Sequence, residues 1–329
     1  MTAAGQPTPR LEPVARIGVL DGADHETFGM IADVAVDADG NIFVLDASTF
    51  DIRWFDSTGR YRGRGGRKGA GPGEFVGPRS LAIGADNVVY ALDGRHRRIS
   101  AYEASGNRLV HRGDVGLPFG LTDICVLGSH IVGVGASATT GPAAQALLHE
   151  FDLDGKLLRS FGSLDQPSAA LLTRLGPTAG AILRTNFNGA RIWCERELDR
   201  ILVLDVSRPL VRVFSGDGKF VRRIELPDFN YPEVGVAHEG ALAWRYNERT
   251  GLWSNGEAIL GDVRGRVVVS LSVRRRGLAE PWGDVRFLTP GGSPVSRWKG
   301  ADVLAAKWGP YVYGFHQEPY PQVVKYRLR

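Results

Sequence analysis

The chain has 329 residues and a formal net charge of +4, with 40 Lys and Arg against 36 Asp and Glu. This modest charge permits an anionic partner but does not require one. Hydrophobic residues make up 43% of the sequence, yet no apolar run approaches the ~20 residues of a membrane-spanning helix, so no membrane span is expected. The 43 glycines and 18 prolines fit a chain with many hairpins.

The first recognisable unit runs from Asp33 to Gly65. It contains four short β-rich runs separated by turn signals, of which Asp37-Ala-Asp-Gly40 and Asp56-Ser-Thr-Gly59 are the clearest. Runs of this kind are typical of antiparallel strands joined by hairpins. Four such strands make one blade of a β-propeller.

The unit repeats along the chain. Aligning Val34 with Leu81, an offset of 47 residues, also aligns Asp46 with Asp93. An aromatic residue followed four positions later by glycine recurs at Phe55/Gly59, Tyr102/Gly106, Phe151/Gly155, Phe214/Gly218 and Phe287/Gly291. The spacing between these pairs grows, which indicates insertions in the later units. Repeats of ~40–50 residues indicate a propeller, with the aromatic ring packed between neighbouring blades.

The sixth unit is split between the two ends of the chain. Three runs, Val303–Ala306, Tyr311–Phe315 and Gln322–Tyr326, lack a fourth, and an unassigned run, 14–19, precedes the first unit. We expect this N-terminal run to be the outer strand of the last blade, which leaves no open edge. A five-bladed ring with free termini is the alternative.

The predicted fold is therefore an all-β, six-bladed β-propeller of four-stranded antiparallel blades, closed by the N-terminal strand. Residues 1–13 form a flexible segment and 14–329 a single domain. The expected blades are residues 33–65, 79–116, 121–162, 189–226, 257–300, and 302–329 plus 14–19.

The stretch that follows the first unit has the most specific pattern. A glycine-rich loop, Gly66–Phe75, is followed by Pro78, an apolar strand, a second strand ending in Asp93, and a basic bend, Arg95–Arg98. This order resembles the NHL-repeat family, strongly over residues 30–115 and weakly later. The resemblance implies a six-bladed ring but fixes no activity, since related propellers include lyases, hydrolases and binding modules.

The two cysteines, Cys125 and Cys194, fall in the inner strands of the third and fourth units. They align with Ala35 and Val36, which point to opposite faces of a strand. We therefore expect two buried free thiols rather than a disulfide.

The compartment is left open by the sequence. No signal peptide is recognisable, and the first nine residues fit either a natural start or a mature end left after removal of an export signal. Bacterial propellers of this kind are often exported. We expect a bacterial monomer that is periplasmic or secreted in the second case and cytoplasmic in the first.

The long connections between strands should all lie on one face of the ring. They are Gly65–Gly77, Ala136–Ala146, Ser163–Asn188, Pro227–Glu257 and Arg274–Trp282. Within Ser163–Asn188, a short helix capped by Ser168 is expected. Because long loops in a compact domain are often functional, the ligand site is predicted over the central channel on this face.

The predicted ligand-binding residues follow from this placement. They comprise four polar rim residues and four aromatic ones: Arg95, His96, Arg208, His316, Trp244, Tyr246, Trp253 and Trp282. The alternative is that the aromatic rings only bury one another. His316 and His96 are also the candidate catalytic residues, because histidine transfers protons near neutral pH. Asp46, Asp93 and Asp205, at equivalent strand ends, are expected to accept backbone hydrogen bonds in the bend.

A second predicted ring marks the starts of the inner strands: Asp33, Ser80, Asp123, Arg191, Ala258 and Asp302. Within it, Asp33, Asp123 and Asp302 offer hard oxygen ligands for a divalent metal such as Ca²⁺. A zinc site using His96, His316 and His238 was also weighed, but no short His or Cys spacing supports it.

The sequence thus favours a propeller that binds an unidentified small molecule or protein partner at its channel mouth. The first alternative is a metal-dependent lyase or hydrolase. The second is RNA binding through basic residues, namely Arg60, Arg62, Arg64, Arg67, Lys68, Arg95, Arg97, Arg98, Arg208 and Arg274–Arg276. The competing explanation for Arg60, Arg62 and Arg64 is that their charges protect an exposed strand edge.

Overall fold

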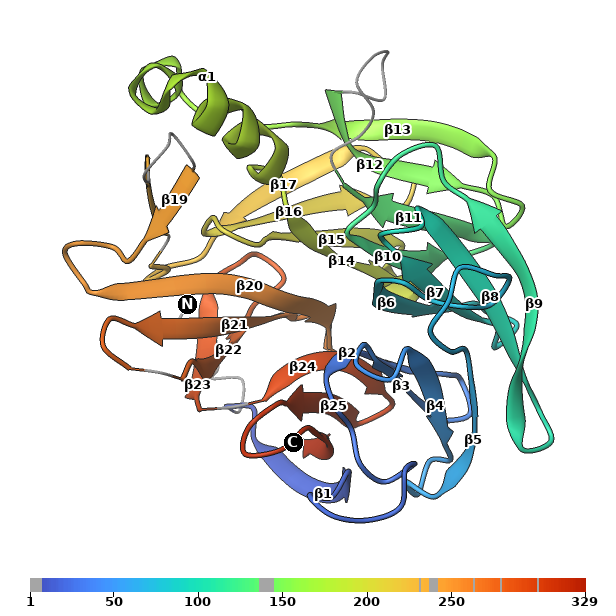
Figure 1. Ribbon diagram of the computed structural model, residues 1–329. Coiled ribbons are helices and arrows are strands. Elements are labelled where there is room, and N and C mark those ends of the chain that lie inside the picture. Colours follow the sequence, from blue (N-terminus) through green and yellow to red (C-terminus); the bar gives the residue numbers. More distant parts are fainter. Residues whose placement is uncertain are drawn as a thin grey trace.

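The computed structural model describes residues 8–135, 145–230, 232–236, 242–262, 264–278, 280–300 and 302–329. Residues 1–7, most of the 136–146 connection, Tyr231 and His238 lie outside this part of the chain. Apart from a two-stranded hairpin described below, the strands form six four-stranded units, called blades one to six, which are arranged in a ring (Figure 1). The all-β propeller architecture is thus as the sequence predicts.

The first three blades follow the chain in order. Blade one contains β2 (Ile31–Val36), β3 (Ile42–Asp46), β4 (Asp51–Phe55) and β5 (Tyr61–Gly65). Blade two contains β6 (Pro78–Ile83), β7 (Val89–Asp93), β8 (Arg98–Ser105) and β9 (Arg108–Gly116). Blade three contains β10 (Asp123–Leu127), β11 (His130–Val134), β12 (Ala146–Phe151) and β13 (Leu157–Ser163).

The later blades are separated by insertions. Blade four contains β14 (Ala190–Glu195), β15 (Arg200–Asp205), β16 (Leu210–Ser215) and β17 (Phe220–Glu225). Blade five contains β20 (Leu252–Gly261), β21 (Val267–Arg275), β22 (Trp282–Leu288) and β23 (Pro294–Lys299). Blade six contains β24 (Val303–Trp308), β25 (Tyr311–His316), β26 (Gln322–Leu328) and β1 (Leu11–Ile17).

The inner strands form a continuous ring. The contacts run from β2 to β6, β10, β14, β20 and β24, and β24 in turn contacts β2. Each inner strand therefore presents one face to the preceding blade and the other to the following blade.

The first strand lies at the outer edge of blade six. Strand β1 pairs antiparallel with β26, with Leu11 opposite Leu328 and Ile17 opposite Val323. It begins at Leu11, inside the segment that the sequence assigns to a flexible end. The side-chain amide of Gln322 donates to the carbonyl of Gly18 at 2.8 Å, which fixes the chain as it leaves this strand.

The repeated aromatic residues pack between neighbouring blades, as predicted. Phe55, Tyr102, Phe151, Phe214 and Phe287 are each at most 2% exposed. Phe55, for example, shares a cluster with Tyr313 of blade six. The glycine four positions after the first four rings has a positive φ, which a tight turn requires and which glycine adopts without strain.

In blades one and two, the Asp at the end of the second strand ties the blade to the connection that precedes it. Asp46 accepts backbone N–H groups from Gly29 at 2.8 Å and Met30 at 3.1 Å, and Asp93 plays the same part in blade two. An arginine on the third strand donates to a carbonyl of the same connection in four blades, through Arg53, Arg98, Arg212 and Arg286. These contacts confirm the structural interpretation of Asp46 and Asp93.

Blades one and two share one eight-stranded sheet. The outer strands β5 and β9 meet in a parallel bridge between Arg64 and Arg108. A Cβ atom on Gly63 would lie 2.3 Å from the carbonyl oxygen of Asn107, so only glycine permits this approach. The edge of β5 is therefore covered partly by another strand and not by its arginines alone.

The predicted helix is longer than the sequence suggests. Helix α1 (Ala169–Asn186) begins after Ser168, whose hydroxyl accepts the N–H of Leu171 at 3.2 Å, and is kinked at Gly176 and Pro177. It packs against the hairpin of β18 (Glu233–Val236) and β19 (Leu242–Arg245). None of the helices in the described ranges is long and apolar enough to cross a membrane.

The expectation of two free thiols is wrong, because Cys125 and Cys194 form a disulfide with a Cα–Cα distance of 5.5 Å. The alignment itself holds, since the two residues do point to opposite strand faces. They lie, however, on neighbouring blades that face each other. Cys125 of β10 turns toward blade four, and Cys194 of β14 turns toward blade three. Opposite faces are what a bond between adjacent inner strands requires.

Candidate functional site

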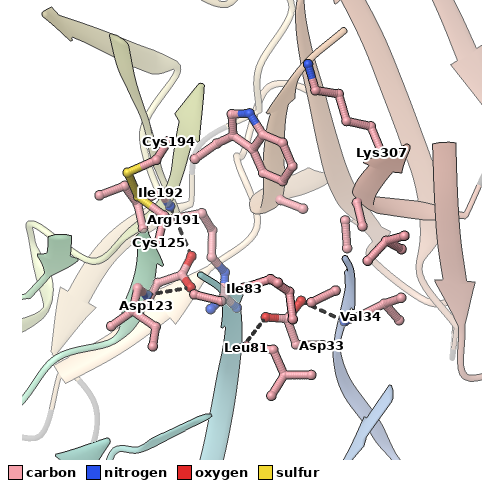
Figure 2. A pocket seen from close by; sticks show the side chains of 18 of the residues that line it. Asp33, Val34, Leu81, Ile83, Asp123, Cys125, Arg191, Ile192, Cys194 and Lys307 are labelled. Carbon is pink, nitrogen blue, oxygen red and sulfur yellow. Dashed lines mark hydrogen bonds between the residues drawn. A yellow bond between two sulfur atoms is a disulfide. The ribbon is translucent and has the colours of Figure 1, made fainter. Parts of the chain in front are cut away.

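A cavity of about 630 Å³ follows the central channel (Figure 2). It is lined by inner-strand residues of all six blades. It extends from Met30 and Arg79, at the starts of the inner strands, to Ala38, Gly84 and Gly309 at the short turns of the opposite face. The cavity therefore runs through the ring and is not confined to the face that carries the long loops.

Two carboxylates connect neighbouring blades at the wall of this cavity. Asp33 accepts the N–H of Val34 and, from the next blade, the N–H of Leu81, both at 2.8 Å. Asp123 repeats the pattern with Ile124 at 2.9 Å and Ile192 at 3.0 Å. Each carboxylate thus satisfies backbone donors of two neighbouring inner strands.

The side chain of Arg191 extends between these two carboxylates (Figure 2). Among the described residues, no ion pair within 4.0 Å and no hydrogen bond involves its guanidinium, and its buried Nε has no partner. Burial raises the pKa of both Asp33 and Asp123, and the positive charge of Arg191 opposes this rise. The arginine is therefore close to the carboxylates without being bonded to them.

Burial dominates the ionisation of this pair. Burial and the negative charge of Asp123 raise the pKa of Asp33 from 3.8 to about 7. Burial likewise raises the pKa of Asp123, against the opposing effects of Arg191 and of a 2.5 Å hydrogen bond from the Ser80 hydroxyl. Near neutral pH the two carboxylates together therefore carry less than two full negative charges.

The rest of the wall is mainly apolar. It includes Ile83, Ile192, Trp193 and Phe315, together with the Cys125–Cys194 disulfide. The indole Nε1 of Trp193 is buried and has no hydrogen-bond partner in the described residues. Further charged side chains, among them Arg79 and Glu257, also line the cavity, so the wall combines apolar and polar groups, as small-molecule sites do.

Side chains cross the channel at its short-turn end. The guanidinium of Arg196, on the 3₁₀ turn Arg196–Leu198 of blade four, donates to the carbonyl of Ile83 in blade two at 2.7 Å. Lys307 of blade six lies 3.6 Å from Glu195 and 3.7 Å from Glu197. Because blade four is adjacent to neither blade two nor blade six, these contacts span the channel opening.

The predicted inner ring is only partly assembled. Asp33, Asp123, Arg191 and Ala258 line the cavity, but Asp302 does not. The Asp302 carboxylate instead contacts His316 Nδ1 at 2.9 Å and accepts a hydrogen bond from the Tyr326 hydroxyl at 2.7 Å. Over the described part of the chain, no three or more His, Cys, Asp or Glu residues are grouped to hold a metal. The predicted three-carboxylate ligand set is therefore not formed.

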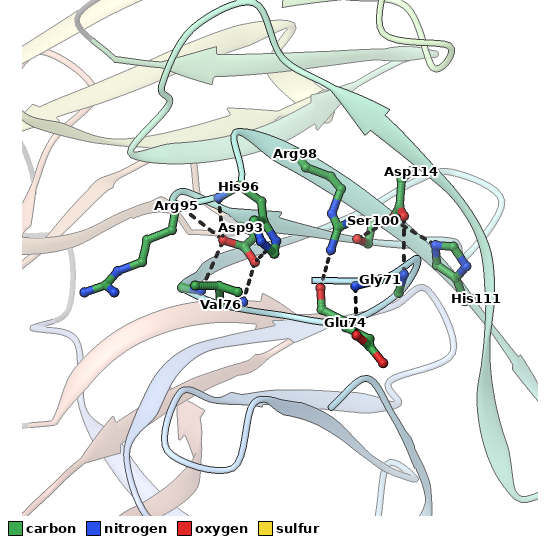
Figure 3. Close-up of polar contacts among 12 residues, drawn as sticks. Gly71, Glu74, Val76, Asp93, Arg95, His96, Arg98, Ser100, His111 and Asp114 are labelled. Carbon is green, nitrogen blue, oxygen red and sulfur yellow. Dashed lines mark hydrogen bonds and ion pairs between the residues drawn. The ribbon is translucent and has the colours of Figure 1, made fainter. Parts of the chain in front are cut away.

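None of the eight predicted ligand-binding residues lines the channel cavity. Arg95 is exposed, and His96 lies with its Nδ1 3.2 Å from the Asp93 carboxylate (Figure 3). His316 is bound by Asp302, as described above. The two candidate catalytic histidines are thus on separate blades, each beside a carboxylate of its own blade.

The predicted aromatic wall is divided. Tyr246 and Trp253 pack edge to face with ring centroids 6.1 Å apart, and the Trp253 indole donates to Asn255 at 2.9 Å. Trp244 packs against α1, and Trp282 begins β22 opposite Val273. These contacts favour the interpretation that the rings stabilise the insertions.

A second cavity, the rim cavity, lies between α1, the β18–β19 hairpin and blade four. Its volume is about 750 Å³, and Arg208 and Trp244 both line it. The Arg208 guanidinium is bound by Asp165 at 2.7 Å and Asp205 at 2.5 Å and lies over the ring of Phe187 at 4.4 Å. These two predicted residues are brought together, but away from the channel.

Part of the predicted basic face is neutralised. Arg98 donates to the carbonyl of Glu74 and lies 3.4 Å from Asp114, as Figure 3 shows, and Arg208 is bound as above. The roles of Arg196, Lys307 and Trp193 in the channel cannot be predicted from the sequence, because they depend on contacts between distant blades. The sequence does predict that Arg191 lies in the ring of inner-strand starts, but it does not show that the side chain lacks hydrogen-bond partners among the described residues.

The fold and its lined channel define a β-propeller, and comparisons with known proteins agree. The family model DUF5128, described as a 6-bladed beta-propeller, matches residues 19–126, about a third of the chain. Among curated proteins, none matches the chain. The NHL resemblance stays a prediction.

Solved structures resemble the whole chain at low identity. A Bacteroides fragilis protein regarded as exported matches with a TM-score of 0.60 and 10% identity, over 100% of this chain and 98% of the other. A DUF4221 family member from Bacteroides vulgatus gives 0.59 and 10%, over 98% and 99%. Virginiamycin B lyase from Staphylococcus aureus gives 0.50 and 10%, over 98% and 100%. At such identities the likeness establishes the fold alone.

Proposed function

We propose that this propeller binds a small molecule inside its central channel. The observation that carries the proposal is the cavity of about 630 Å³ in which the Arg191 guanidinium has no hydrogen-bond partner among the described residues. The Arg191 side chain is half-buried, and a guanidinium that no protein group pairs keeps its donors available to a ligand. The volume falls within the ~300–1,000 Å³ range of ligand pockets.

The cavity offers a ligand both apolar and charged contacts. The apolar wall around Ile83, Ile192 and Phe315 suits a hydrophobic body, while Arg191 suits an anionic group. Arg196 and Lys307 reach across the channel and narrow its short-turn end.

The test uses 8-anilinonaphthalene-1-sulfonate, an aromatic sulfonate whose fluorescence rises in apolar surroundings. We expect saturable binding to the native protein. Ala258→Phe, which places a ring in the channel cavity, should weaken binding at least 10-fold. Ser207→Phe, which fills the rim cavity in the same way, is the matched control and should leave binding unchanged. Loss of the signal in the control variant alone, or no saturable signal, would overturn the proposal.

We also infer that the protein works in an oxidising compartment, outside the cytoplasm. Disulfides persist in the periplasm and outside the cell but are rare in the cytosol. The Cys125–Cys194 bond supports this inference, and the exported class of one structural neighbour agrees with it. Thiol titration of the denatured protein, purified without reductant from its own cells, should find no free thiol. Two free thiols would contradict the inference.

A second candidate function is enzymatic and centres on His316. The Asp302 carboxylate lies 2.9 Å from His316 Nδ1 and orients the ring, as in a general base. A metal-dependent lyase or hydrolase would need ligands other than Asp33, Asp123 and Asp302 together. Metal content after loading with Ca²⁺ or Zn²⁺, and turnover of an ester panel by wild type and His316→Gln, test this candidate. No bound metal and no His316-dependent turnover would remove it.

A further inference from the structure

We propose that the channel ligand is a zwitterion, with an anionic group for Arg191, an adjacent ammonium for Asp33 and Asp123, and an apolar body such as the side chain of an α-amino acid. This inference rests on the proposed function, since it concerns the same cavity. It names the chemistry of the ligand's head group, which the cavity volume alone does not.

The first argument is the sign of the charges. Arg191 alone would favour an anion, whereas Asp33 and Asp123 alone would favour a cation. All three point into one cavity from neighbouring or nearly neighbouring blades (Figure 2). A ligand with only one charge would face at least one like charge at short range, which is unfavourable.

The second argument is the spacing of the groups. The Arg191 guanidinium lies between the carboxylates, yet no ion pair within 4.0 Å joins them in the described part of the chain. Had the arginine served only to neutralise the aspartates, direct contact would be expected, as between Arg212 and Asp205 at 3.1 Å. The separation instead leaves room for a molecule that contacts both signs of charge.

The third argument is that the carboxylates are held in place before a ligand arrives. Asp33 and Asp123 each accept backbone N–H groups of two inner strands, and Ser80 adds a bond to Asp123. A carboxylate oxygen has two lone pairs, so each can still accept from an ammonium. Fixed acceptors lose little entropy on binding, which favours affinity.

The test compares three probes that differ only in their charged groups. L-Phenylalanine has both groups, phenethylamine lacks the carboxylate, and 3-phenylpropanoate lacks the ammonium. Titration calorimetry on the full chain at pH 8 should find phenylalanine bound at least 10-fold more tightly than either analogue. This comparison uses only wild-type protein, so it does not depend on the folding of any variant.

Two variants then test which protein side chain contacts each charged group of the ligand. Arg191→Gln should weaken phenylalanine binding and strengthen phenethylamine binding, because it removes the like charge that the ammonium faces. Asp33→Asn should weaken phenylalanine binding and strengthen 3-phenylpropanoate binding for the same reason. Circular dichroism checks that both variants are folded, and Ser207→Phe serves as the control at the rim cavity.

The outcomes are separable. Equal affinity for all three probes, or no heat with phenylalanine at millimolar concentration, would overturn the zwitterion inference. The proposed function would still stand in that case if the native protein binds the naphthalene sulfonate and the Ala258→Phe variant binds it at least 10-fold more weakly. Loss of both signals would remove both proposals.

Discussion

The channel and the loop-bearing rim differ in what their polar side chains do. On the rim, the residues that looked like ligand contacts are bonded to other protein groups, as with His316 to Asp302 and Arg208 to Asp165 and Asp205. In the channel, Arg191 forms no ion pair or hydrogen bond among the described residues, although single buried nitrogens without hydrogen-bond partners occur on the rim as well, at His96 and Arg208. The charged groups of these rim residues are therefore paired within the protein, whereas that of Arg191 is not.

The largest effect on stability is expected from removing the Cys125–Cys194 disulfide in the channel wall. Cys125→Ser with Cys194→Ser should lower the free energy of unfolding by about 4 kcal/mol, because the disulfide closes a loop spanning 69 residues. Urea unfolding followed by tryptophan fluorescence measures the loss. Wild type with reductant should match the double variant, and an unchanged midpoint in both would refute the expected role of the bond.

A rim carboxylate should affect stability but not binding. Asp93→Ala leaves the backbone donors of Val76, Gly77, Arg95 and His96 without their acceptor, and we expect a loss of about 3 kcal/mol. Affinity for the naphthalene sulfonate should be unchanged in the folded variant. Asp154→Ala, at an exposed turn, is the control and should cost under about 0.5 kcal/mol. Weaker probe binding with intact folding would place Asp93 in the ligand site after all.

Asp33 should make stability depend on pH. Its pKa is raised from 3.8 to about 7 by burial and by Asp123, although Arg191 and the N–H groups of Val34 and Leu81 oppose the shift. Between these two values the folded chain holds a proton that the unfolded chain has released, so stability falls as pH rises.

The comparison with Asp33→Asn isolates this effect from other groups. Relative to the variant, wild type should lose roughly 1 kcal/mol per pH unit between pH 4 and 7. Urea unfolding across this range measures the difference. Parallel curves for the two proteins would show that Asp33 does not titrate in this window.

The smallest effect concerns the rim aromatics. A double-mutant cycle with Tyr246→Leu and Trp253→Leu should give a coupling of about 1 kcal/mol in stability, because the rings pack edge to face. Probe affinity should remain that of wild type throughout. A 10-fold fall in affinity in either single variant would instead support the aromatic wall as a ligand surface.

Local sequence signals predicted the blades well, because turns such as Asp37–Gly40 and the buried ring of Phe55 depend on near neighbours and on strand alternation. The inner-strand ring was also visible, including Arg191. The disulfide was missed because the alternation rule was applied to one sheet, whereas Cys125 and Cys194 lie on two facing sheets.

The hydrogen-bond partners of the site residues could not be predicted from the sequence. Whether Arg208 is bonded or Arg191 is free depends on groups that the chain brings together from other blades. The contacts that hold Asp302 away from the cavity, with His316 and Tyr326, leave no mark in the sequence. Contacts such as Arg196 with Ile83 join residues 113 positions apart, beyond the reach of repeat alignment.

The pairing of β1 with β26 has a mechanical consequence. Arg10 and Arg329 exchange backbone hydrogen bonds at 3.1 and 3.0 Å, so the two chain ends leave the sheet at the same corner. A force applied to both ends would break the backbone hydrogen bonds between β1 and β26 one after another and not all at once. Tethering the protein by both termini would therefore peel off its first strand under a small load.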